Sequence, residues 1–120
     1  MVGIPDAGEN VDMDFELRTI SGCPNTTPAA GLFARALGLE GADPAALAIR
    51  EVVTDEGAAS LGFHGSPTFT IDGADLFPVA TAPAMTCRVY PTPQGLGGLP
   101  TLESLRGAVR AALARSARTV

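Results

Sequence analysis

The sequence predicts an α/β fold whose elements follow the order strand, helix, strand, helix, strand, strand, helix (β-α-β-α-β-β-α). Segments with the alternating polarity of strands recur along the chain, and segments with helical periodicity lie between them. Glycine and proline mark the boundaries between segments. Strands separated by helices favour a parallel pair with a right-handed crossover, and the two later consecutive strands favour an antiparallel hairpin on the same sheet.

Length and charge limit the function classes. The 120 residues have the length of one domain, and the formal net charge is −5. An acidic chain lacks the positive surface that attracts nucleic acid or an anionic bilayer. We find neither a membrane-spanning apolar run nor a secretory signal. We therefore expect a cytoplasmic protein with no nucleic-acid or membrane partner, whose two cysteines are thiols rather than a structural disulfide.

The first strand begins after residues 1–12, which have no periodicity and are expected to form a flexible leader. From Asp14 the residues alternate, and the strand ends at Ser21 and Gly22. One face is expected to carry Phe15, Leu17 and Thr19, and the other Glu16, Arg18 and Ile20.

The helix that follows has two possible starts. Cys23 could be the N-cap with Pro24 at the first helical position, or Thr27 could be the N-cap with Pro28 at that position. The first start would place the Cys23 thiol at the positive end of the helix. The predicted buried stripe consists of Leu32, Phe33, Ala36 and Leu37.

Residues 46–53 are enriched in β-branched side chains and predict the second strand, parallel to the first. The alternative is a helix over residues 46–51. Thr54 is expected to cap a short helix that ends at Gly62. The inward residues of this helix are expected to be Ala58, Ala59 and Leu61.

The third strand is expected over residues 68–72, after Ser66 and Pro67, and Gly73 closes it. Residues 73–86 form a loop that is long for a hairpin, and residues 87–90 are expected to form the fourth strand. Residues 91–100 predict a turn-rich link. Thr101 then caps a terminal helix with a core stripe of Leu102, Leu105, Val109 and Leu113.

Cys23 is a candidate reactive group because it follows the carboxyl end of the first strand, where ligands collect in α/β sheets. The free N–H groups of a helix start favour a thiolate, which is both a nucleophile and a metal ligand. The alternative is an inert, half-buried cysteine.

The order of elements, the turn GCPNT at residues 22–26 and the segment GSPT at residues 65–68 resemble the thioredoxin family over about residues 13–115. The resemblance implies a thioredoxin-like domain over residues 13–117, with a mixed four-stranded sheet and helices on both faces. It also implies a cis bond before Pro67 and substrate binding by Pro24, Ser66 and Pro67. The alternative is a trans proline at the start of an edge strand.

Thr26 stands where thioredoxins carry the second cysteine of C-x-x-C, so no disulfide can form within this motif. The Thr26 hydroxyl either donates a hydrogen bond to the Cys23 thiolate or caps the helix. Cys23 and Thr26 are therefore the predicted catalytic residues of the turn.

Cys87 is the other cysteine of the chain. In a plain hairpin it would lie at the far end of the third strand, roughly 13 Å from the Cys23 turn. A loop that folds back would bring Cys87 to Cys23 as a third catalytic residue. Two roles of Cys87 therefore remain open: it is either a resolving thiol or a buried cysteine of the fourth strand.

A narrower similarity is to small thioredoxin-like proteins, some of which are labelled alkylmercury lyases. It rests on CPN at residues 23–25, GSPT at 65–68, CRVY at 87–90 and GLPT at 98–101. A lyase needs two thiolates and an acid, and no Asp follows Cys23 at the spacing of lyase motifs. His64 could complete a metal site with the cysteines, but the close spacings of zinc motifs are missing, so we expect no metal and no cofactor.

We thus expect a thiol redox protein whose partner is a protein or small molecule that carries a thiol or disulfide. The alternatives are a soft-metal or organomercury protein that uses Cys23 and Cys87, and a non-catalytic binding module.

Overall fold

The computed structural model describes residues 13–118, so the predicted leader at 1–12 lies outside the described residues. The elements are β1 (Phe15–Thr19), α2 (Thr26–Leu39), the short 3-10 helix η1 (Pro44–Ala46), β2 (Leu47–Glu51), α3 (Asp55–Leu61), β3 (Thr68–Ile71), β4 (Ala74–Asp75), β5 (Tyr90–Thr92), β6 (Gly95–Gly97) and α4 (Leu102–Arg118). None of the helices within residues 13–118 combines the length and apolar character of a membrane span.

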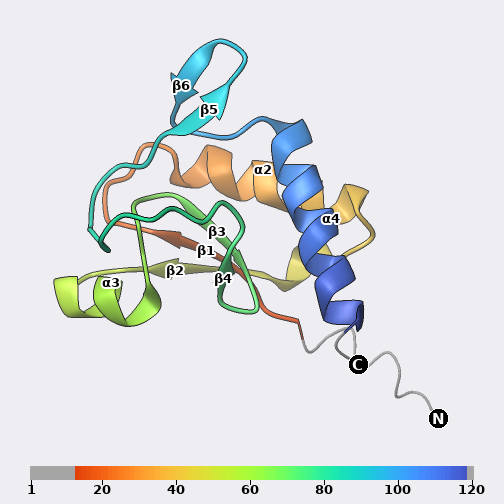
Figure 1. Ribbon diagram of the computed structural model, residues 1–120, viewed down its shortest axis with the longest axis horizontal. Helices are drawn as coiled ribbons and strands as arrows, with labels where there is room; N and C mark the ends of the chain where they lie inside the picture. Colours follow the sequence, from red (N-terminus) through yellow and green to blue (C-terminus); the bar gives the residue numbers. More distant parts are fainter. Residues whose placement is uncertain (1–12, 119–120) are drawn as a thin grey trace.

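Four strands form one mixed sheet in the order β2-β1-β3-β4 (Figure 1). β1 pairs in parallel with β2, and Leu17 lies beside Ile49. β1 also pairs antiparallel with β3, which places Phe69 on the other side of Leu17. The predicted parallel pair is therefore confirmed.

The fourth strand of the sheet is not the predicted segment 87–90. It is β4, which pairs with β3 directly after a turn at Asp72 and Gly73. Both turn residues have positive φ, 53° and 80°. Two such residues make the tight hairpin turn whose twist matches that of the flanking strands, and Asp-Gly is a preferred sequence for it. The expected 14-residue hairpin connection was therefore wrong because this turn closes the hairpin first.

Residues 87–90 instead divide between two pairings. Cys87 forms an isolated parallel bridge with Ser66. Tyr90 begins β5, which pairs with β6 in a separate two-stranded sheet, so the predicted link at 91–100 contains a hairpin. In Figure 1 this hairpin projects beyond the four-stranded sheet.

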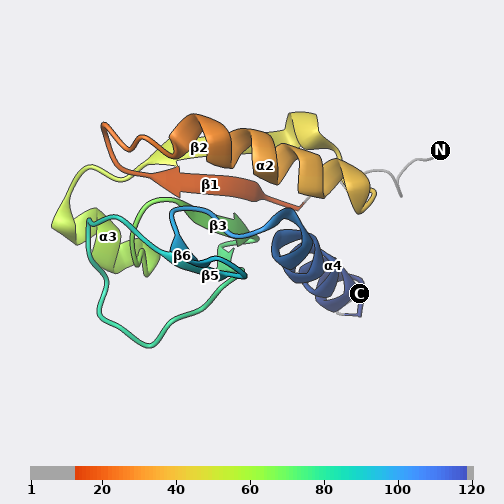
Figure 2. The ribbon, with the colours of Figure 1, turned by 90° about the horizontal axis from the view of Figure 1, so that it is seen from above.

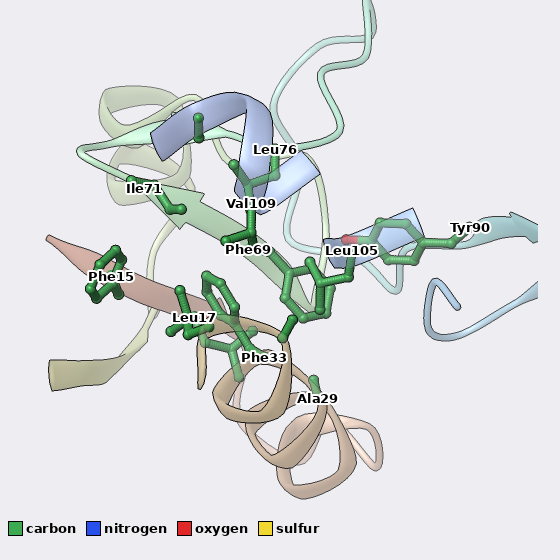
Figure 3. Close-up of a cluster of buried hydrophobic side chains, with 13 residues drawn as sticks. Phe15, Leu17, Ala29, Phe33, Phe69, Ile71, Leu76, Tyr90, Leu105 and Val109 are labelled. Atoms are coloured by element: carbon green, nitrogen blue, oxygen red, sulfur yellow. The ribbon is translucent and has the colours of Figure 1, made fainter. Parts of the chain in front are cut away.

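The main core lies between the sheet, α2 and α4 (Figure 3). Phe33 of α2 meets Phe69 of β3 edge to face, with ring centroids 5.3 Å apart. Leu105 and Val109 of α4 are fully buried in the same cluster. Each such side chain contributes roughly 1.5–3 kcal/mol of transfer free energy on burial. The other members of the predicted α2 and α4 stripes are buried or partly buried here: Leu32, Ala36, Leu37, Leu102 and Leu113.

A smaller cluster lies under α3, where Ala58 packs with Val52 and Phe63. Figure 2 shows α2 and α3 on opposite sides of β1. Thr54 caps α3 as predicted, since its Oγ1 accepts the Gly57 N–H at 2.9 Å. Ala59 is exposed, contrary to the prediction, because the short helix turns only a narrow face toward the sheet.

Candidate functional site at the Cys23 turn

Cys23 lies in the turn between β1 and α2 and is half-buried. The Cys23 N–H donates to the Ile20 carbonyl at 3.3 Å, and the Thr26 N–H donates to the Cys23 carbonyl at 3.3 Å. α2 begins at Thr26 with Asn25 as N-cap, so neither predicted helix start was right. Pro28 is tolerated because it falls in the first helical turn, where an N–H has no partner within the helix.

Hydrogen bonds stabilise the thiolate of Cys23. Burial raises the pKa of the thiol, but the Ser66 side chain, the backbone of Asn25, and the side chain and backbone of Thr26 together lower it below its ordinary value. The Thr26 hydroxyl therefore contacts Cys23, which is one of its two predicted roles. The N-cap of the helix is Asn25, so Thr26 is not the capping residue.

Ser66 joins the Cys23 turn to the start of β3. It is fully buried, and its Oγ accepts the Ile20 N–H at 3.2 Å as well as contacting Cys23. The Ser66–Pro67 peptide bond is cis, as the resemblance implies. The Pro67 carbonyl accepts a hydrogen bond from the Tyr90 hydroxyl. Pro67 is buried whereas Pro24 is exposed, so the three predicted substrate-binding residues differ in their access to solvent.

Cys87 lies directly beside Ser66. The Ser66 N–H donates to the Thr86 carbonyl at 2.7 Å, and the Arg88 N–H donates to the Ser66 carbonyl at 2.9 Å. The loop has therefore folded back, and the far-end position expected for a plain hairpin was wrong. Both cysteines are free, and Cys87 is exposed rather than buried in a strand. Figure 1 shows this segment at the same end of the molecule as the β1–α2 turn.

Gly65 allows segment 86–88 to approach Ser66. Its φ is 118°, which favours glycine, and a Cβ there would lie 3.0 Å from the Arg88 Cβ and 3.2 Å from the Thr86 carbonyl oxygen. Any other residue would push the segment away.

Arg88 anchors the same segment from inside the protein. Its Nη1 donates to Asp75 Oδ2 at 2.8 Å and to Thr68 Oγ1 at 3.2 Å. Its Nη2 donates to the Phe77 carbonyl, and its guanidinium carbon lies 4.9 Å from the centre of the Tyr90 ring. No role was predicted for Arg88 beyond its place in the motif at 87–90. The position of Arg88 between two apolar residues was the sequence feature that could have indicated a buried partner.

An open pocket of about 400 Å³ adjoins Cys23 on the side of β2. Its lining comes from the end of β1, the turn, the start of α2 and the edge strand β2. The lining residues are Thr19, Ile20, Ser21, Gly22, Cys23, Thr26, Ile49 and Glu51. Ile49 and Glu51 were not predicted as site residues. The predicted parallel pairing of the first two strands could have indicated them, because the carboxyl ends of parallel strands lie at the same edge of a sheet.

His64 does not join the cysteines in a metal site. It is half-buried, and its Nδ1 lies 3.5 Å from the Thr81 hydroxyl. Among residues 13–118 no group of three or more His, Cys, Asp or Glu side chains is placed to hold a metal ion.

The structure thus brings Cys23, Thr26, Ser66 and the backbone of Cys87 together, with a thiol whose pKa is lowered at the edge of a pocket. Such a group can attack a soft electrophile or bind a soft metal. Comparison of the chain with family models, with curated proteins and with solved structures found no match.

Proposed function

We propose that this protein is a thioredoxin-like thiol redox protein in which Cys23 is the nucleophile. The observation that carries the proposal is the hydrogen bonding of Cys23 by Ser66 and Thr26, which lowers the pKa of the thiol. The sheet order β2-β1-β3-β4 and the cis bond before Pro67, beside the cysteine turn, support the thioredoxin-like assignment.

The first step is attack on a disulfide. The Cys23 thiolate attacks one sulfur of the substrate, the S–S bond of the substrate breaks, and one half leaves as a thiolate. The other half stays bound to Cys23 as a mixed disulfide. Thr26 cannot resolve this species because it has no thiol.

Cys87 is the proposed resolving thiol, since its backbone lies beside Ser66. Its thiolate attacks the Cys23 sulfur, releases the second half of the substrate as a thiolate and leaves a Cys23–Cys87 disulfide. The substrate gains two electrons and the two cysteines lose two. An external thiol in excess then returns the protein to the dithiol form.

The test is single-turnover reduction of bis(2-hydroxyethyl) disulfide by the pre-reduced protein, followed by mass spectrometry without reductant. The wild type should form an internal disulfide, and Cys87→Ser should accumulate the mixed disulfide on Cys23. Cys23→Ser should form neither. Unchanged reduction of the substrate by Cys23→Ser would overturn the proposal. No reduction by the wild type would favour a non-catalytic binding module.

A second candidate is a soft-metal protein, because the Ser66 side chain contacts the Cys23 thiol and the backbone of Ser66 pairs with that of Cys87, so both free cysteines are neighbours of one residue. Thiolates are preferred ligands of soft metals. Stoichiometric mercury binding should then need both cysteines. Equal mercury affinity of the wild type and Cys87→Ser would rule out the paired site.

A further inference from the structure

Segment 86–88 closes one side of the Cys23 turn. The Ser66 backbone donates its single N–H to Thr86 and accepts from Arg88. Each residue has one backbone donor, so Ser66 has none left for an incoming chain. An extended peptide therefore cannot pair with Ser66 as a further strand while this segment is in place.

The other side of the turn is open. There the pocket of about 400 Å³ leads to Cys23 past the edge strand β2. Ile49 lines it as an apolar side chain that is 54% exposed, which suits contact with a small organic group.

Glu51 is the one residue with a charged side chain among those that line this pocket. Its neighbour Arg50 does not line the pocket and pairs with Glu16, Nε to Oε2 at 3.2 Å. The approach to Cys23 from the open side therefore passes a single negative charge.

We propose that the substrate of Cys23 is a low-molecular-weight disulfide that is neutral or cationic, and that Glu51 determines this selectivity. The inference rests on the proposed function of Cys23 as a nucleophile. A carboxylate that lines the same pocket as the reacting cysteine attracts a cationic reagent and repels an anionic one, and salt screens both effects. We expect the cationic-to-anionic rate ratio to be on the order of tenfold at low salt.

The experiment compares three disulfides of similar size with pre-reduced protein at low ionic strength: cationic cystamine, neutral bis(2-hydroxyethyl) disulfide and anionic dithiodiglycolate. Wild-type rates should fall in that order. Glu51→Gln should bring the cationic-to-anionic ratio close to one, and Glu51→Lys should invert it. A change in the pKa of Cys23 alone would alter all three rates together and leave the ratio unchanged.

Asp14→Asn is the matched control, because it removes one exposed carboxylate before β1, at the opposite end of that strand from Cys23. Its ratio should equal that of the wild type. Equal wild-type rates with all three reagents, or faster reduction of a disulfide-linked peptide than of the neutral reagent, would overturn this inference alone. Failure of the wild type to react with even the neutral disulfide would overturn the proposed function itself.

Discussion

At the scale of single residues, the reactivity of Cys23 depends on hydroxyl groups from two parts of the chain. Cys23 lies two residues before the N-cap Asn25, so it is not itself the helix cap. Ser66 reaches it from the segment just before β3, and Thr26 reaches it from the first position of α2. The lowered pKa is therefore a property of the assembled turn.

Removing either hydroxyl should raise the pKa of Cys23. We expect the pH profile of iodoacetamide alkylation of Cys87→Ser to have its midpoint below the free-thiol value of about 8.5. Adding Ser66→Ala or Thr26→Val should move the midpoint upward, so that less thiolate reacts at neutral pH. The midpoint is measured by mass spectrometry of quenched samples.

Ser21→Ala is the control for these variants, because Ser21 lines the pocket without contributing to the lowered pKa of Cys23. Ser66→Ala also loses the hydrogen bond from Ile20, which could impair folding. Thr26→Val tests the effect of a hydroxyl on the thiol without that loss. Profiles that coincide in all four proteins would show that the hydroxyls do not stabilise the thiolate.

At the scale of elements, an ion pair between Arg88 and the four-stranded sheet holds segment 86–88 beside Ser66. The side chain of Arg88 is only 5% exposed and that of Asp75 15% exposed. This pair fastens the segment to β4, whereas β5 and β6 continue it into a separate hairpin. The position of Cys87 therefore depends on a buried ion pair.

Arg88→Met should destabilise the protein by about 3 kcal/mol, because it leaves the mostly buried Asp75 carboxylate without its cation. Urea unfolding monitored by circular dichroism measures this loss. Arg50→Met is the matched control, since that arginine is 53% exposed in its pair with Glu16 and should cost less than about 1 kcal/mol. Equal losses in the two variants would contradict the role of Arg88 as anchor.

At the scale of the whole molecule, Glu40 connects the end of α2 to α4. Its carboxylate accepts from Arg106 Nε at 2.8 Å and from Arg110 Nε at 3.0 Å. The hydrogen bond from Arg110 and then that from Arg106 lower the pKa of Glu40 to about 2. These contacts join the two helices that cover the main core, through residues that are far apart in the sequence.

The stabilisation that Glu40 provides should be lost at acid pH. Its folded pKa of about 2 lies below its ordinary value of about 4.3, so the unfolded chain takes up the proton first. The stabilisation is complete above the ordinary value and is lost as the pH falls toward 2. The difference in melting temperature between wild type and Glu40→Gln should therefore be largest above pH 5 and shrink on acidification.

Glu103→Gln, at an exposed position in the first turn of α4, is the comparison variant for removal of a carboxylate that does not join α2 to α4. A wild-type advantage over Glu40→Gln that is constant from pH 7 to pH 2 would contradict the carboxylate as its source.

Local features of the sequence predicted much of the fold. The strand at Phe15–Thr19 and the stripe through Phe33 and Leu37 were confirmed, because periodicity records which side of an element faces the core. Arg18, on the other face of the strand, is buried as well. Thr54 and Thr101 were identified as caps, since a cap bonds to an N–H only a few residues away. The candidate nucleophile Cys23 was also found in this way, from its position between a strand and a helix.

The sequence by itself thus determined the β1–α2 turn that carries Cys23, the short helix after Thr54, β3 and the terminal helix. Only the tertiary structure decided that Cys87 lies beside Ser66, that Ser66 and Thr26 meet Cys23, and that Glu51 lines the same pocket. These contacts join residues up to dozens of positions apart. They arise from strand pairing, a two-residue turn and the burial of Arg88, which leave no periodic pattern in the sequence around the residues that they bring together.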